Sequence, residues 1–166
     1  MVTQQPGLHR DDWLNAVRKE LDDLERLISR ANRAMDSAKR NPQDLDLYID
    51  SASLNLHDVY SGFERVFKQI AATVDGNVPS SAEWHRELLE QMGLDLPKVR
   101  PSVLTPDSIQ KLDEYLRFRH VVRNIYTFSF DSERIERLVK ELRPVFDQVR
   151  QELLAFAGFL EKVGAE

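Results

Sequence analysis

The chain has 166 residues, of which 42% are hydrophobic and 31% are charged, and its formal net charge is -5. It contains no cysteine, which excludes disulfides, zinc-thiolate sites and thiol nucleophiles. No run approaches the roughly 20 apolar residues of a membrane span, and the N-terminal stretch lacks an apolar signal core. We therefore expect one cytoplasmic domain over residues 1–166, with residues 1–10 flexible.

Two long amphipathic helices are predicted in the first half of the chain. Apolar residues recur at three- and four-residue intervals over residues 11–40, and this helix should end near Pro42, because proline disfavours helix in the residue before it. The second pattern covers residues 44–74 and should stop at Gly76.

A short helix and a loop are predicted next. Ser80 or Ser81 can cap a helix that contains Trp84 and ends at Gly93. Residues 94–104 include two prolines, which indicates an extended loop that crosses the bundle.

The next helix has a clear start signal. Thr105 is a typical N-cap, Pro106 suits the first helical position, and Asp107 adds a favourable first-turn charge. This helix bears the stretch RFRHVVRNIY, residues 117–126, and should fray over residues 127–130.

A final helix is predicted over residues 132–163, with Asp131 as its cap. Pro144 lies within it, so we expect a kink or a break near Arg143. No strand alternation appears. The fold class is therefore all-α, an up-and-down bundle of long amphipathic helices with one short inserted helix.

The stretch at residues 117–126 concentrates polar chemistry in an otherwise acidic chain. At about 100° per residue, one third of the helix circumference carries the side chains of Arg117, His120, Arg123 and Asn124. Such a face suits recognition of a phosphate with proton transfer beside it. An ordinary solvated face is the plainer alternative.

These residue types fit metal-free cleavage of RNA. His120 is the natural proton carrier, because an unperturbed histidine titrates around pH 6.5. Arg123 can bind the non-bridging phosphate oxygens bidentately, and Asn124 can orient either partner. One face holds too few groups for a whole active centre, so we expect a symmetric homodimer to complete it.

The sequence gives less support for a nucleotide, metal or cofactor site. No nucleotide-binding loop or zinc-protease string occurs, and no glutamate-x-x-histidine pair is present, so we expect neither a metal nor a cofactor. The neighbours His57 and Asp58, and likewise Trp84 and His85, are predicted to be structural. Glu64 can face the same groove as the arginine-rich stretch, but a surface salt bridge is the preferred interpretation.

Four segments together resemble the HepT-like proteins of the HEPN superfamily, in the order and spacing expected of that family. They are LHDVYSGFERVFKQIA, WHRELLEQM, VRPSVL and LDEYLRFRHVVRNIYTFSFD. The resemblance implies a dimeric helical bundle that acts as a ribonuclease toxin on RNA. It also implies a partner, a small nucleotidyltransferase antitoxin of the MNT type.

The family's usual catalytic string is an arginine, four to six residues, a histidine, one residue and a tyrosine. Five residues beyond Arg123 the chain has Phe128, and the histidine instead precedes the arginine, at His120. The order resembles a HepT-like branch that carries RHxxRNxY. The resemblance thus implies that His120, Arg123 and Asn124 are the catalytic residues.

In related toxins the motif tyrosine is adenylylated by the antitoxin, which makes Tyr126 the candidate here; aromatic packing at a helix end is the alternative. Arg119 lies near Tyr126 on the helical wheel and, with Arg117, is a candidate for binding RNA. We therefore predict a metal-independent endoribonuclease toxin that leaves a 2',3'-cyclic phosphate. The alternatives are a catalytically weak bundle that serves as an adaptor for the nucleotidyltransferase, and a plain scaffold.

Overall fold

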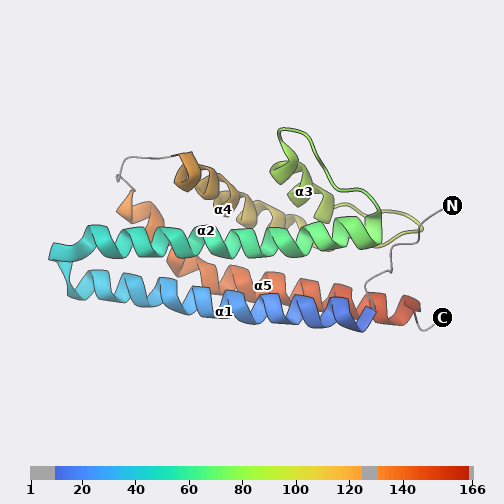
Figure 1. The fold of residues 1–166 in the computed structure, drawn as a ribbon, viewed down its shortest axis with the longest axis horizontal. Coiled ribbons are helices and arrows are strands. Elements are labelled where there is room, and N and C mark those ends of the chain that lie inside the picture. The colour runs from blue at the N-terminus through green and yellow to red at the C-terminus, as the bar shows by residue number, and fades with distance from the viewer. Residues whose placement is uncertain (1–9, 125–130, 165–166) are drawn as a thin grey trace.

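The computed structural model describes residues 10–124 and 131–164. Four long helices run alternately up and down, and a short helix lies against one side of them (Figure 1). Their bounds are Arg10–Arg40 for α1, Leu45–Ile70 for α2, Trp84–Met92 for the short α3, Pro106–Asn124 for α4 and Ser132–Gly164 for α5. No strand occurs in these two ranges, so the predicted all-α bundle with one inserted helix is confirmed.

Helices α1 and α2 form an antiparallel pair (Figure 1). A short 3-10 helix, η1 (Pro42–Asp44), joins them where the proline was expected to end the first helix. Gly62 lies where α2 meets α1, and a Cβ placed there would come 2.3 Å from Cδ2 of Leu24. The absence of a side chain at Gly62 therefore allows the two helices to approach closely.

Helix α2 continues into a short π-helix, η2 (Ala71–Asp75), which the sequence pattern did not predict. Gly76 ends it in the left-handed conformation, with a φ of 69°. Its backbone N–H, and that of Asn77, donate to the carbonyl of Ala71. Glycine adopts this conformation without steric cost, which explains the predicted stop.

The start of α3 differs from the prediction. Its N-cap is Glu83, not a serine. Ser81 instead shapes the turn before it, because its Oγ accepts from the backbone N–H of Glu83 at 3.1 Å and donates to Glu87 at 2.7 Å. Gly93 follows the last residue of α3, as predicted.

The predicted caps of the last two helices are confirmed. Thr105 Oγ1 accepts from the backbone N–H of Ser108 at 3.3 Å at the start of α4. Asp131 accepts from the backbone N–H groups of Glu133 and Arg134 at the start of α5. Helix α5 runs through Pro144 without a break. The predicted fraying over residues 127–130 falls outside the described part of the chain.

The apolar faces of all five α-helices meet in one hydrophobic core. Helices α2 and α5 both contact α1 and α4, while α3 packs on α2 and α4. The largest side chains that are fully buried include Tyr60, Phe63, Phe67, Phe118 and Phe146. No helix in the described ranges is long and apolar enough to cross a membrane.

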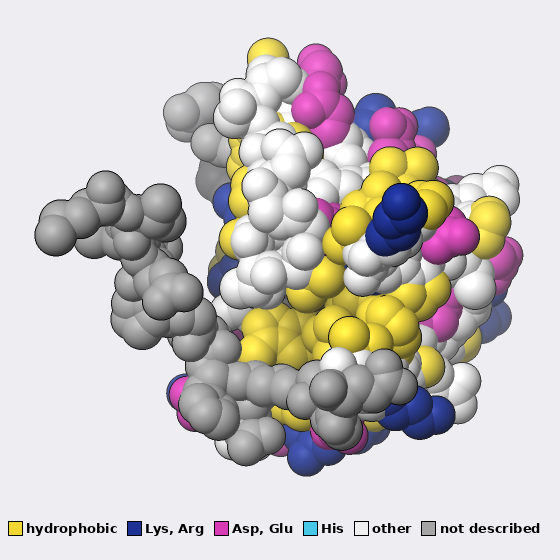
Figure 2. Space-filling model, turned by 90° about the vertical axis from the view of Figure 1, so that its right-hand side faces the viewer, with side chains coloured by type: hydrophobic (Ala, Val, Ile, Leu, Met, Phe, Trp, Pro, Cys, Tyr) yellow, Lys and Arg dark blue, Asp and Glu magenta, His cyan; other side chains and the backbone are white. Residues whose placement is uncertain are grey.

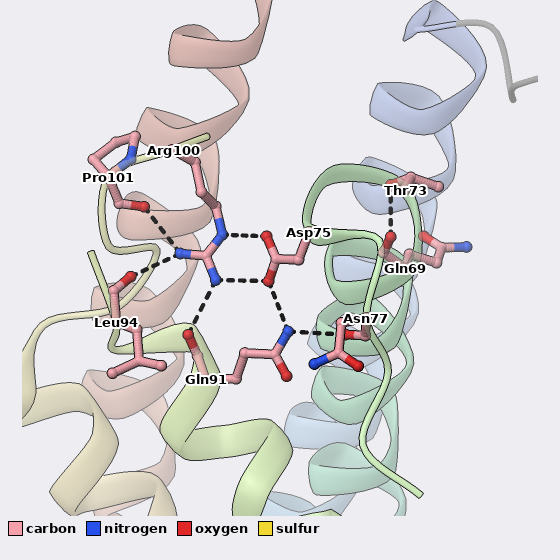
Figure 3. A network of polar contacts seen from close by, with 8 residues as sticks. All are labelled: Gln69, Thr73, Asp75, Asn77, Gln91, Leu94, Arg100 and Pro101. Carbon is pink, nitrogen blue, oxygen red and sulfur yellow. Dashed lines mark hydrogen bonds and ion pairs between the residues drawn. The ribbon is translucent and has the colours of Figure 1, made fainter. Parts of the chain in front are cut away.

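A buried arginine ties the loop after α3 to the end of the π-helix η2 (Figure 3). The Arg100 guanidinium forms an ion pair with Asp75 and donates to the carbonyls of Leu94, Gln91 and Pro101. The side chains of Arg100 and Asp75 are only 0% and 2% exposed. This network joins the residue that precedes the connection to α3, Asp75, to the loop that follows α3, at Arg100.

The end of the bundle where this loop lies presents a broad hydrophobic area, with acidic side chains along part of its rim (Figure 2). Hydrophobic side chains that remain exposed on the loops beside α3 include Val78, Leu94 and Val99.

Candidate functional site

A buried polar cluster lies where α2, α3 and α4 meet. Glu64 of α2 is 4% exposed and His85 of α3 is 7% exposed. The imidazole Nδ1 lies 2.7 Å from Oε2 of Glu64. The preferred interpretation of Glu64 as a surface salt bridge is therefore wrong, because its carboxylate is buried against His85.

Arg119 of α4 completes this cluster. Its Nε donates to Ser61 Oγ at 3.2 Å, its Nη2 lies 3.8 Å from Oε1 of Glu64, and its side chain is 12% exposed. Its Nη1 lies 3.1 Å from Nδ1 and 3.3 Å from Nε2 of His85. Glu64 can only accept, so it takes the proton on Nδ1, and the lone pair on Nε2 is then free to accept from Arg119.

His120 follows Arg119 in α4 but is exposed. Its ring meets that of His85 edge to face, with 5.6 Å between the ring centroids and 89° between the planes. The pKa of His120 is lowered below its ordinary value. The largest cause is partial loss of hydration against the packed helices, and the nearby His85 and Arg119 lower it further. An imidazole with a lowered pKa is neutral at pH 7 and can accept a proton.

An aromatic side chain flanks His85, and a cation lies over that aromatic ring. The indole of Trp84 stacks on it, with 3.5 Å between ring centroids, and Lys68 Nζ lies 3.9 Å from the Trp84 centroid. Trp84 and His85 were predicted to form an isolated structural pair, whereas His85 also contacts Glu64, Arg119 and His120.

A tyrosine hydroxyl is buried one turn before Glu64. Tyr60 is 1% exposed, and its hydroxyl has no hydrogen-bond partner among the described residues. Burial first, and the Glu64 carboxylate second, raise the pKa of Tyr60 far above its ordinary value. The hydroxyl therefore stays protonated and adds no charge to the cluster.

A second group of charges lies at Asp113 of α4. Arg86 Nη1 lies 2.6 Å from one carboxylate oxygen of Asp113, and Arg117 Nε lies 2.9 Å from the other. Two guanidinium groups share one carboxylate, so a positive charge remains here. Arg117 is the more exposed of the two, with 66% of its side chain accessible.

The predicted site residues thus fall into three groups. His120 and Arg119 lie at the buried cluster, and Arg117 lies at Asp113. Arg123 and Asn124 belong to the last turn of α4, but their side chains fall outside the described part of the structure, as does Tyr126. In the described ranges, no group of three His, Cys, Asp or Glu side chains could hold a metal ion.

Sequence reasoning missed the roles of Glu64 and His85 in this cluster. A signal for Glu64 existed, because it lies on the same stripe of α2 as the buried Tyr60, Phe63 and Phe67. A carboxylate at a core position needs a partner. His85 carried a weaker signal, three residues before the buried Leu88.

Comparison with known proteins gives the family. A family model for HepT-like proteins matches residues 51–160. The chain is a HepT-like protein of the HEPN superfamily. No curated protein and no solved structure matches it. The match to the HepT-like family covers α3, α4 and α2 from residue 51 onward, which includes every residue of the polar cluster.

The arginine and the tyrosine of the string, but not its histidine, also match this HepT-like chain from a different starting point. Counted from Arg119, four residues lead to Asn124, and one more leads to Tyr126. In this alignment an asparagine takes the place of the histidine, and His120 follows the arginine directly. His120, which lies between the arginine and the asparagine of this spacing, is the residue there that can exchange a proton at neutral pH.

Proposed function

We propose that this HepT-like protein is a metal-independent endoribonuclease and the toxin of a toxin–antitoxin pair. The observation that carries the proposal is the exposed imidazole of His120 above the buried cluster of Glu64, His85 and Arg119. Membership of the HepT-like family adds support.

The chemistry proceeds by transfer of the phosphate within the RNA strand. His120 accepts the proton of a ribose 2'-hydroxyl, whose oxygen attacks the neighbouring phosphorus. The bond to the 5'-oxygen of the next nucleotide breaks, and that oxygen takes up a proton. The products are a 2',3'-cyclic phosphate and a free 5'-hydroxyl.

The other predicted residues act on the phosphate. Arg117 and Arg123 bind its non-bridging oxygens, and Asn124 orients the reacting groups. Arg119 supplies a fixed positive charge from the buried cluster beside His120. The reaction uses dimers in which one His120 is neutral and the other has taken up a proton. The protonated one donates its proton to the leaving oxygen, which requires a homodimer.

RNA cleavage by the purified protein in the presence of a chelator tests the activity. The wild type should cleave RNA, and His120→Ala should lose about 100-fold or more in rate, because general acid–base catalysis contributes about that much. His57→Ala is the matched control, because His57 pairs with Asp58 elsewhere on α2. Equal rates for His120→Ala and the wild type would refute the role of His120.

Dilution tests the homodimer. The rate per subunit should fall at concentrations where sedimentation shows that the dimer dissociates, because each site then loses its second histidine. Full activity of a monomer would contradict the shared site.

Silencing by an MNT-type nucleotidyltransferase is the second part of the proposal. We propose Tyr126 as the residue that receives the adenylate, which would block the RNA site with bulk and negative charge. Intact-mass measurement after co-expression should show added adenylate on the wild type and none on Tyr126→Phe. An unmodified wild type beside an active partner would remove this idea.

A binding role without cleavage is the second candidate. Asn124 at the histidine position of the string favours it, and so does the engagement of Arg119 inside the protein. In that case the wild type would not cleave RNA but would still form a stable complex with the nucleotidyltransferase.

A further inference from the structure

The proposed chemistry leaves two buried ionisable residues without a task. Glu64 and His85 come from different helices, and their side chains are only 6% and 8% exposed. Burying a carboxylate is costly unless it is paired and hydrogen-bonded. Buried ionisable groups beside an exposed histidine are therefore candidates for a part in the site.

We propose that Glu64 and His85 are positioning residues of the site, which hold the Arg119 guanidinium and the His120 ring in a fixed relation. The inference rests on the proposed function, because the reaction that it serves is RNA cleavage through His120.

The contacts follow one another from α2 to α4. Glu64 accepts from His85 Nδ1 at 2.7 Å, which fixes the orientation of the imidazole. The ring then contacts Arg119 Nη1 through its nitrogens and His120 at its edge. Arg119 is held from its other side by Ser61. The short inserted helix thus supplies the residue that joins the α2 carboxylate to the two α4 side chains.

The charges around His120 give the direction of the expected change. Arg119 in α4 and Arg86 in α3 oppose protonation of His120, as does His85, whereas Glu83 before α3 favours it. Glu64 acts on His120 through the residues that it holds in place. If the Glu64–His85 pair is lost, Arg119 is released and water reaches His120, so its pKa should rise toward the ordinary value.

The experiment combines two measurements on the same variants. Glu64→Gln keeps the shape and an acceptor oxygen for His85 but removes the charge, whereas His85→Gln removes the imidazole. The first measurement is the NMR titration of His120, which needs no activity, and the second is the pH dependence of RNA cleavage. Glu20→Gln is the matched control, because Glu20 pairs with Arg65 on the α1–α2 surface.

Both site variants should titrate His120 at a higher pH than the wild type and shift the acid limb of the pH–rate profile in the same direction. Their cleavage rates should fall about 10- to 100-fold, the loss that removal of an outer partner typically causes at metal sites. Glu64→Ala should lose more than Glu64→Gln, because it also removes the acceptor. Glu20→Gln should behave as the wild type.

The outcomes separate the two proposals. If either site variant is folded and leaves the His120 titration and the cleavage rate unchanged, the positioning role is overturned. If the wild type itself cleaves no RNA, the proposed function fails, and the NMR titration still decides whether Glu64 and His85 control His120. Should Glu64→Gln fail to fold, His85→Gln carries the same test.

Discussion

Arg119 and His120 are neighbours in the chain but lie in different environments. The Arg119 guanidinium points inward to Glu64, Ser61 and His85, whereas His120 is exposed. The difference arises because α2 and α3 supply a carboxylate and an imidazole on one side of α4 only. At the residue scale, the candidate site is therefore a buried cation beneath an exposed base.

The lowered pKa of His120 predicts how stability depends on pH. Between the folded pKa and the unfolded value of about 6.5, the unfolded chain binds more protons than the folded protein. The free energy of unfolding should therefore decrease as the pH falls through this window. Urea denaturation between about pH 7.5 and 5.5 should show a steeper loss for the wild type than for His120→Gln. Parallel curves would contradict the shift.

At the scale of elements, two glycines within helices differ in the space around them: one is tightly packed and the other faces open space. Gly62 lies against the side chains of Leu24 and Glu20 of α1, so a methyl group there would displace the buried Leu24 side chain or the helix that carries it. Gly158 in α5 has no atom within 4 Å of the Cβ that it lacks. The close α1–α2 contact therefore depends on Gly62, whereas α5 does not depend on its glycine.

These settings predict changes of opposite sign. Gly62→Ala should lower the free energy of unfolding by about 1–3 kcal/mol, because the core there is already packed. Gly158→Ala should raise it by up to about 1 kcal/mol, because alanine favours helix. Urea denaturation of both variants measures the difference. A stabilised Gly62→Ala would show that α1 and α2 are not as close as the structure has them.

The loop after α3 depends on one arginine. Arg100→Met would leave the Asp75 carboxylate buried without its ion-pair partner, which typically costs about 3–5 kcal/mol. Arg65→Met is the matched control, because Arg65 forms an ion pair with Glu20 with 59% of its own side chain exposed, and such pairs contribute about 0–1 kcal/mol. Thermal unfolding compares the two. Equal losses would mean that the buried network does not hold the loop.

At the scale of the whole molecule, all five α-helices contribute to one core. A single core predicts that the chain unfolds as one cooperative unit. The two tryptophans allow a direct test, since Trp13 lies in α1 and Trp84 in α3.

The single-tryptophan variants Trp13→Phe and Trp84→Phe should each show a fluorescence transition that coincides with the loss of helix by circular dichroism. The inserted helix would unfold earlier if it formed a separate unit. Two midpoints in Trp13→Phe, where only Trp84 reports, would contradict the single core.

Local signals in the sequence predicted much of the fold. Thr105 and Asp131 cap helices through their own side chains, and Gly76 and Gly93 end elements by their position, so each boundary could be read from a few adjacent residues. The π-helix before Gly76 had no such signal.

Contacts between distant elements could not be predicted in the same way. The pairing of Glu64 with His85, and of Arg100 with Asp75, depends on how α3 and its loop pack against α2. Helix α5 continues through Pro144 without the break that was one of the two outcomes expected there. The helical wheel placed His120 on an exposed face, but it could not show that Arg119 turns inward.

The three residues of the polar cluster are far apart in the chain, so they are synthesised at different times, and this matters for incomplete chains. Glu64 is synthesised first, His85 follows 21 residues later, and Arg119 comes 34 residues after His85. A nascent or truncated chain that stops before α4 has the carboxylate and the imidazole but lacks the guanidinium. We expect such fragments to be degraded, because the carboxylate and the imidazole would lack the guanidinium that packs against them.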